Sequence, residues 1–161
     1  GQDTLKKYAP PHADTNAVQW GVYRREVTVT ITRALFSKPK EELTDVKENI
    51  FILSGLGRQD FISTAAHELT HDLLAEKYPE ISAKAPAWVE EGLCQYVSAG
   101  VCLLNAWYKE LKVIENAPDH EYGGGYRYFK KKFGDADWHD IVQWIKTTDI
   151  ASLPAVPPGF Q

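Results

Sequence analysis

The chain has 161 residues, of which 43% are hydrophobic and 25% are charged. This composition is that of an ordinary globular protein and argues against a disordered chain, and the length predicts one domain over residues 1–161. The net charge of −4 argues against nucleic acid as a partner. The sequence has no apolar run near the ~20 residues that cross a bilayer, which argues against a membrane.

The first third of the chain alternates between irregular and extended patterns. Residues 1–16 contain two adjacent prolines and little apolar pattern, and predict an extended arm or loop. Valine and isoleucine alternate with threonine over residues 27–32, which predicts a half-buried strand. The charged residues of 37–48 predict a solvated loop or short helix. The apolar run 49–53 predicts a buried strand, and it is followed by a turn that contains Gly55.

Residues 67–71 spell His-Glu-Leu-Thr-His, and the apolar residues around them predict a mostly buried helix. Asp60 is a candidate cap for its start. Tyr78-Pro79 should end it, because the residue before proline disfavours the helical conformation. The apolar positions expected on the buried face are Phe61, Ile62, Ala65, Ala66, Leu69, Leu73 and Leu74.

Four residues along a helix are a little over one turn, so His67 and His71 leave the same face and can bind one zinc ion. Glu68 lies on the same turn and can act on a zinc-bound water without being a ligand. Two helical histidines can also simply pair with surface carboxylates. The zinc hypothesis therefore depends on a third ligand elsewhere in the chain.

A carboxylate on the next predicted helix can supply that ligand. Pro86 suits the first turn of a helix, so residues 86–98 predict one that carries Glu90 and Glu91. A carboxylate there could complete a His, His, Glu set with water in the fourth position. Gln95, one turn after Glu91, could hydrogen-bond a ligand and orient it.

Residues 99–118 are expected to stay largely helical. Cys94 and Cys102 would lie about 12 Å apart along one helix, too far for a disulfide, which predicts two small buried thiols. The face expected to pack consists of Trp107, Tyr108, Leu111 and Ile114.

The last part of the chain contains three consecutive glycines, residues 123–125, each of which costs a helix about 1 kcal/mol. They could let a backbone approach the cleft closely. Gly134 should stop the helix that follows, and Asp135 or Asp137 should cap a last helix. Residues 154–161 predict an irregular tail.

The motif and the Glu91-Gly92 pair that follows it resemble the gluzincin family of zinc peptidases. Gluzincins carry HExxH and then, after a similar gap, a glutamate on a following helix, often directly before glycine. The resemblance implies that Glu91 rather than Glu90 is the third ligand. It also implies an edge strand that pairs with the extended substrate, a role for which residues 49–55, including Gly55, are the candidate. An interior strand is an equal alternative for that segment.

Residues 49–153 further resemble the peptidase domain of the plant LIM-domain peptidases that limit organ growth and are activated by ubiquitylation. The shared motifs, in order, are Gly55–Arg58, Ala66–His71, Glu90–Gln95 and Tyr122–Arg127. The LIM zinc modules of those proteins have no counterpart here, because this sequence contains only two cysteines.

The resemblance assigns roles to two residues of the last motif. In larger gluzincins, the tyrosine of a Tyr-x-x-Gly pattern stabilises the oxyanion of the tetrahedral intermediate, which implies that role for Tyr122. A tyrosine of the core is the alternative. Arg127 could bind a substrate carbonyl or carboxylate, or could pair with an acidic side chain.

These patterns predict an α+β fold of the compact zincin type, with a small twisted sheet packed on the motif helix and a mainly helical C-terminal half. The expected activity is hydrolysis of a peptide or protein substrate, with one zinc ion per chain and Glu68 as general base. Glu90 and Glu121 are ambiguous candidates for holding a free amine, so an endopeptidase is favoured. The alternative is a metal-binding, non-catalytic interaction module derived from a peptidase, which would not need Glu68.

Overall fold

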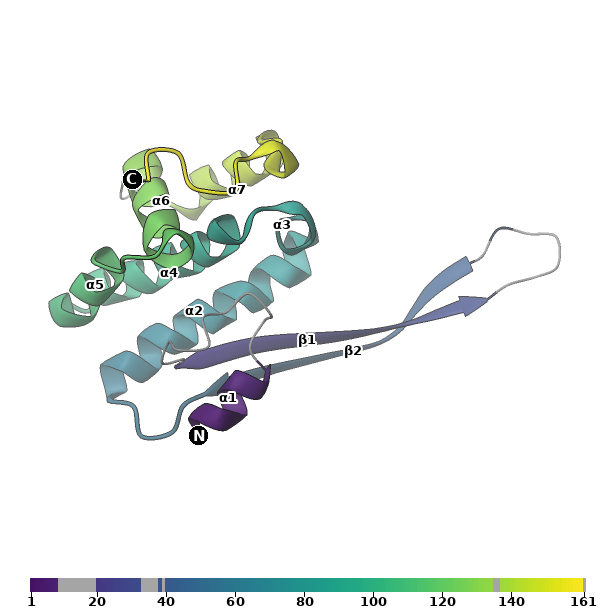
Figure 1. Cartoon of the computed structure of the whole chain (residues 1–161), viewed down its shortest axis with the longest axis horizontal. Helices are drawn as coiled ribbons and strands as arrows, with labels where there is room; N and C mark the ends of the chain where they lie inside the picture. Colours follow the sequence, from purple (N-terminus) through teal and green to yellow (C-terminus); the bar gives the residue numbers. More distant parts are fainter. Residues whose placement is uncertain (9–19, 33–37, 39, 135–136, 161) are drawn as a thin grey trace.

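The computed structural model describes residues 1–8, 20–32, 38, 40–134 and 137–160, and these form an α+β chain (Figure 1). Two antiparallel strands, β1 and β2, form the sheet of the described part, and the helices that follow make up most of the molecule. The predicted class, with a mainly helical C-terminal half, is therefore confirmed. The elements are α1 (Gln2–Tyr8), β1 (Gly21–Thr32), β2 (Lys40–Ile52), α2 (Arg58–Lys77), α3 (Pro79–Lys84), α4 (Ala87–Leu104), α5 (Tyr108–Glu115), the π-helical turn η1 (His120–Gly124), α6 (Gly125–Phe133), α7 (Trp138–Thr147) and the 3-10 turn η2 (Ile150–Ser152).

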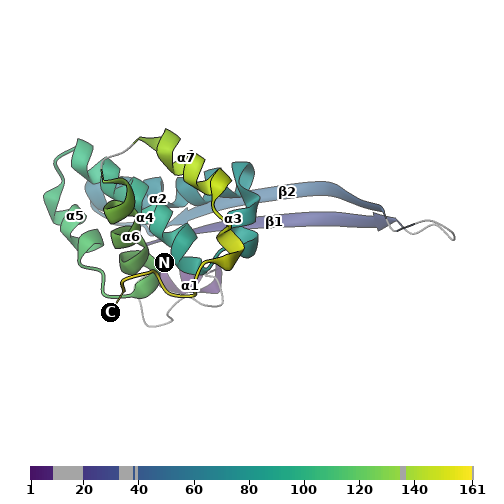
Figure 2. The same cartoon turned by 90° about the horizontal axis from the view of Figure 1, so that it is seen from above.

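The hairpin of β1 and β2 is covered by helices at its base and exposed to solvent at its far end. At the base, Gly21 pairs with Ile52, and β1 contacts both α1 and α2. The register shifts once, between Thr28 and Val29. Beyond the base every residue of β1 from Glu26 to Thr32 is exposed. Figures 1 and 2 show the far end of the hairpin extending well past the helices in both views.

Four expectations for this region were wrong. The strand predicted over 49–53 is the end of β2, but Asn49 is exposed and the residues after it are half-buried rather than buried. Gln2–Tyr8 is helix α1 rather than part of an extended arm, and residues 9–16 lie outside the described part. Residues 40–48 belong to β2 rather than to a loop or helix, because their main chain pairs with β1. The strand predicted over 27–32 exists within the longer β1, but it is exposed rather than half-buried.

Helix α2 ends where the sequence predicts, at Lys77 before Tyr78-Pro79. Its start is different, because Gly57 occupies the cap position and no side chain caps it, whereas Asp60 lies within the first turn. The negative charge of Asp60 still suits the positive end of the helix dipole.

The buried face of α2 is also different from the predicted one. Phe61, Leu69 and Leu73 are exposed, by 48%, 56% and 37%. The helix instead buries Ser63, Thr64, His67, Glu68, Thr70, Leu74 and Ala75. The polar motif therefore faces the interior of the molecule, and part of the apolar face is left in solvent.

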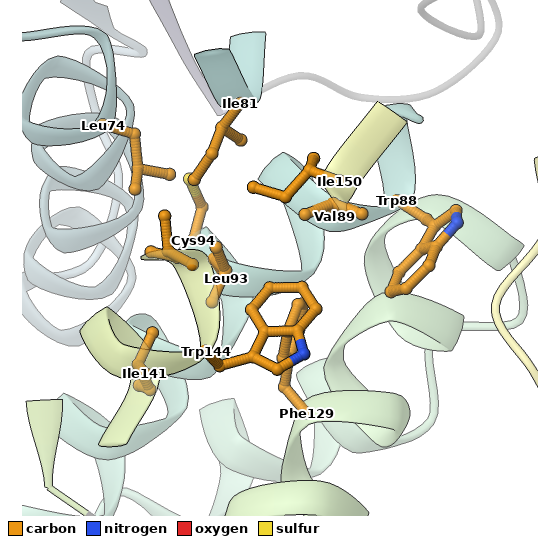
Figure 3. Packing of buried hydrophobic residues seen from close by; sticks show 11 residues of the cluster. Leu74, Ile81, Trp88, Val89, Leu93, Cys94, Phe129, Ile141, Trp144 and Ile150 are labelled. Carbon is orange, nitrogen blue, oxygen red and sulfur yellow. The ribbon is translucent and has the colours of Figure 1, made fainter. Parts of the chain in front are cut away.

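The main core lies among α4, α6 and α7, with contributions from α2 and α3 (Figure 3). Trp88 and Leu93 of α4 are fully buried, as is Phe129 of α6, and Trp144 of α7 packs edge-on against Phe129 with ring centroids 5.2 Å apart. A smaller cluster around Leu111 and Ile114 holds α5, as predicted for those two residues, whereas Tyr108 is 63% exposed.

Helices α4 and α6 cross at two glycines. A Cβ on Gly92 would lie 2.6 Å from the Cα of Gly125, and a Cβ on Gly125 would overlap the carbonyl oxygen of Trp88. The helices can approach this closely only because neither residue has a side chain. The glycines of η1 and α6 therefore let the backbone pack tightly against α4 and its surroundings, and the helical conformation continues through them.

The C-terminal segments follow the sequence closely. Gly134 ends α6 with φ 61°, a conformation that glycine adopts readily. Asp137 caps α7 by accepting from the backbone N–H groups of His139 and Asp140, whereas Asp135 lies outside the described residues. Residues 154–160 contain no helix or strand.

Candidate metal centre

The two histidines of the motif meet at their Nε2 atoms. His67 and His71 lie one turn apart on α2, and their Nε2 atoms are 3.2 Å apart. Both side chains are nearly buried, with 11% and 12% of their surface exposed. Because α2 turns its polar face inward, the pair points toward α4 rather than toward solvent.

Glu91 of α4 reaches both histidines. Its Oε2 atom lies 3.2 Å from Nε2 of His67 and 3.4 Å from Nε2 of His71. A tetrahedral ion bound at roughly 2.0–2.1 Å separates its ligand atoms by roughly 3.3–3.4 Å. The three measured separations match the edges of such a tetrahedron, so this set of donors fits a small tetrahedral metal ion.

Cys94, which the sequence predicts only as a small buried thiol, is a further donor. The ligand atoms of His67, His71 and Cys94 all lie within 4.8 Å of one another, so this group too could hold a metal ion. Cys94 follows Glu91 by three residues on α4 and is fully buried. The i, i+3 spacing, which places both side chains on one helix face, was the signal available in the sequence.

Glu90 lies on the other side of His71. Its Oε1 atom is 3.1 Å from Nδ1 of His71, so the Nδ1–H donates to the carboxylate, and the Ser82 hydroxyl donates to the same oxygen at 2.8 Å. This bond turns Nε2 of His71 toward Glu91, as carboxylates commonly orient metal-binding histidines. The structure thus gives Glu90 an orienting position and places Glu91 at the two Nε2 atoms.

The pKa values of the two buried carboxyls, Glu91 and Glu68, are shifted in opposite directions. Burial alone would raise the pKa of Glu91, but His71 and His67 beside it hold that pKa well below its usual range. Burial raises the pKa of Glu68, and this effect exceeds the lowering by the same two histidines. Glu91 is therefore suited to hold a negative charge against a cation, and Glu68 to accept and release a proton.

The base of β1 covers the site, which the sequence did not reveal. The backbone N–H of Tyr23 donates to the carboxylate of Glu68, and the ring of Tyr23 stacks on that of His71, with centroids 6.3 Å apart and planes at 3°. A Cβ on Gly21 would overlap the Glu68 carboxylate. Gly21 is therefore required for the strand to pass so close to the motif.

Tyr122 lies against the other histidine of the motif, His67. Its ring stacks on that of His67, with centroids 6.0 Å apart and planes at 23°. Asp119 fixes the turn by accepting from the backbone N–H of Tyr122 at 2.6 Å. Burial, and then the negative charge of Glu91, raise the pKa of the Tyr122 hydroxyl, which keeps it protonated as a hydrogen-bond donor.

The other predicted site residues lie elsewhere. Arg127 donates to the backbone carbonyls of Glu115 at 3.1 Å and Ala117 at 2.8 Å, so it clamps the chain before η1 rather than facing a substrate. Gly55 sits in the exposed turn after β2 with φ 88°, and Gln95 is half-buried on α4.

Residues 49–55 were expected to form either an edge strand that pairs with substrate or an interior strand of the sheet. Residues 49–52 are the end of β2, which has one unpaired edge among the described strands, so the interior-strand alternative does not hold there. The strand that touches Glu68 through its main chain is β1, not this segment.

Comparison with models of protein families, with curated proteins and with solved structures finds no match for this chain. In the described part of the chain, no helix is both long and apolar enough to cross a membrane.

Proposed function

We propose that this protein is a zinc-dependent peptidase of the gluzincin type. The observation that carries the proposal is the convergence of Glu91 Oε2 on the Nε2 atoms of His67 and His71, at separations that suit a tetrahedral ion. Imidazole and carboxylate donors in that geometry favour zinc. A binding site alone would not need the buried Glu68 beside these donors, which supports hydrolysis.

Each residue then has a defined task. Zinc held by His67, His71 and Glu91 would act as a Lewis acid that acidifies water and polarises a carbonyl. Glu68 accepts the proton of the attacking water and passes it to the leaving amine, for which its raised pKa is suited. Tyr122 donates a hydrogen bond to the oxygen that gains negative charge as the peptide carbonyl is attacked.

Tyr23 supports this arrangement from β1. Its backbone N–H fixes the Glu68 carboxylate, and its ring holds the imidazole of His71 in place. The same main chain offers the unpaired edge of β1 beside Glu68, where an extended substrate could add as a further strand. Binding through the main chain tolerates many sequences, which suits an endopeptidase.

Metal content and cleavage of an unstructured protein test the proposal, measured together on the wild type and on Glu68→Gln, Glu91→Gln and Glu76→Gln. Glu76 is a matched control, because it lies on α2 but is exposed and, among the described residues, pairs with Lys77 rather than with the site. We expect about one zinc per chain in all except Glu91→Gln. Hydrolysis should fall roughly 10²–10⁴-fold in Glu68→Gln and stay unchanged in Glu76→Gln. Full activity of Glu68→Gln, or a wild type without metal, would contradict the proposal.

A non-catalytic metal site is the second candidate, and the position of Cys94 is the observation that favours it. If Cys94 joined His67, His71 and Glu91, four protein ligands would close the site, as in structural zinc sites. Cobalt substitution distinguishes the two, because a thiolate ligand gives an intense charge-transfer absorption that Cys94→Ala would remove. The peptidase proposal predicts no such band and the closed site predicts it, together with no hydrolysis.

A further inference from the structure

The far end of the hairpin, here called the arm and consisting of residues 26–32 and 40–46, exposes apolar side chains in an ordered row. Val27, Val29 and Ile31 of β1 are 49%, 46% and 52% exposed, and Leu43, which pairs with Val29, is 59% exposed. A two-stranded hairpin is marginally stable in water, and strands that face solvent normally carry polar side chains there. The row therefore indicates a surface that binds another apolar molecule or chain segment.

The row continues the side of β1 that faces the metal centre. Side chains alternate along a strand, so residues 23, 25, 27, 29 and 31 share one side. At the base, Tyr23 on this side stacks on His71, and Arg25 donates to the backbone carbonyl of Ala75 on α2. Where α2 ends, at Lys77, nothing in the described part of the chain replaces it against the strand, and the apolar row begins.

The main-chain edge of β1 is continuous over the same distance. β1 pairs with β2 along one edge, and no described strand pairs with the other. The N–H of Tyr23, which donates to Glu68, marks where β1 meets the site. From Tyr23 to Thr32 the strand spans about 30 Å at ~3.3 Å per residue. A chain added to this edge beyond Tyr23, whose N–H already donates to Glu68, would therefore run from beside the candidate catalytic carboxylate to Thr32 at the far end of β1.

The arm carries four acidic residues, Glu26, Glu41, Glu42 and Asp45, and one basic residue, Lys40, so it is net negative. Two of these acidic residues pair with basic residues just outside the arm, Glu26 with Arg24 at 2.5 Å and Asp45 with Lys47 at 3.7 Å. What the arm offers is an unpaired strand edge together with apolar side chains at every second position. An extended polypeptide with the same two-residue period matches both features.

We propose that the arm binds the extended, apolar part of a polypeptide substrate whose scissile bond lies at the metal centre. This inference rests on the proposed peptidase function and defines its substrate class as long, unfolded chains with alternating apolar residues. A second copy of this chain could also cover the row. We favour the substrate because the edge leads directly to Glu68, a continuity that pairing between two copies would not need.

The test compares three peptides with one scissile sequence. One is short and spans only the site, and the other two are each extended by about ten residues of alternating leucine and threonine, one before and one after the scissile bond. The proteins are the wild type, Val29→Lys/Ile31→Lys, and the matched control Thr28→Lys/Thr30→Lys, which places the same charges on the opposite side of β1. Circular dichroism verifies that each variant is folded.

For the wild type, we expect kcat/KM to be roughly tenfold or more higher for one extended peptide than for the short one. The ratio should fall to near one in Val29→Lys/Ile31→Lys and should persist in the control. The proposal is overturned if extension on neither side helps the wild type, or if the gain survives Val29→Lys/Ile31→Lys. It is also overturned if ultracentrifugation shows a wild-type dimer that this variant converts to a monomer.

Peptide binding to the Glu68→Gln variant separates this inference from the proposed function. Fluorescence anisotropy measures the affinity without hydrolysis, in the presence and absence of the arm substitutions. Tighter binding of the extended peptide that is lost with Val29→Lys/Ile31→Lys supports the arm even if the wild type cleaves nothing, in which case the peptidase proposal alone fails. Equal binding of all three peptides overturns the arm proposal whatever the activity.

Discussion

The helical body of this protein buries its apolar side chains, whereas the arm exposes them. In the body, Trp88, Leu93 and Phe129 are fully buried, and two helices meet glycine to glycine at Gly92 and Gly125. In the arm, every described residue of β1 from Glu26 onward is exposed, including Val27, Val29 and Ile31. The free energy of unfolding should therefore depend on the body, whereas the side chains of the arm are available for binding.

The candidate metal centre lies where these two regions meet. α2 contributes its polar face, α4 contributes Glu91 and Cys94 from the edge of the core, and β1 contributes the main chain of Tyr23. α4 packs against both α6 and η1, and η1 carries Tyr122 beside His67. Substitutions in the body and in the arm test whether the free energy of unfolding depends on the body.

The largest effect is expected from Leu93→Ala in the body. Leu93 is fully buried in the main core, so its truncation removes apolar burial and leaves a cavity. We expect a loss of about 2–5 kcal/mol in the free energy of unfolding. Leu104→Ala is the control, since that leucine lies on the same helix but is 88% exposed, and its change should stay within about 0.5 kcal/mol. Urea unfolding in the presence of a chelator measures both without any contribution from metal binding. Equal losses would mean that the core is not packed as described.

A smaller effect, and one of opposite sign at two positions, is expected for Gly→Ala on α4. A methyl group added at Gly100 would meet nothing within 4 Å, so Gly100→Ala should gain about 0.5–1 kcal/mol from helix propensity. At Gly92 the methyl would lie 2.6 Å from the backbone of Gly125, and the helices would have to separate. We expect Gly92→Ala to lose about 1–3 kcal/mol. Chelator-treated urea unfolding again provides the measurement. A gain at both positions would show that the crossing tolerates a side chain.

The sequence predicted best where local chemistry decides the structure. Proline at 79 marked the end of α2, Pro86 marked the start of α4, and glycine at 134 marked the end of α6. The spacing of the histidines followed from helix geometry alone, and the structure brings Glu91 to them. These signals act over one or two turns, and at these three positions tertiary contacts do not override them.

The sequence did not predict the structure where contacts between residues far apart in the chain, or polar groups in the interior, determine it. Gly21 and Tyr23 reach the motif across more than forty residues of chain, and nothing near them in the sequence indicates it. The charges of 40–48 suggested a loop, yet a strand with both faces in solvent tolerates them.

The buried face of α2 failed for a different reason. The polar residues His67, Glu68 and Thr70 face inward, which places Leu69 and other apolar residues outward, so the hydrophobic pattern predicts the wrong face. The position of Arg127 likewise depends on carbonyls of the preceding turn, which no motif indicates.

The smallest effect is expected from a change within the arm, compared with the same change at the base of the same strand. Val22 is only 4% exposed, so Val22→Thr buries a hydroxyl in place of a methyl group and should cost about 1–3 kcal/mol. Val29 is 46% exposed, and Val29→Thr keeps a β-branched side chain in solvent, so its free energy of unfolding should change by less than about 0.5 kcal/mol. Urea unfolding at a protein concentration low enough to keep the chain monomeric compares the two. A loss at Val29 as large as at Val22 would mean that the arm packs against the body in solution, and its apolar row would then be part of the fold rather than a binding surface.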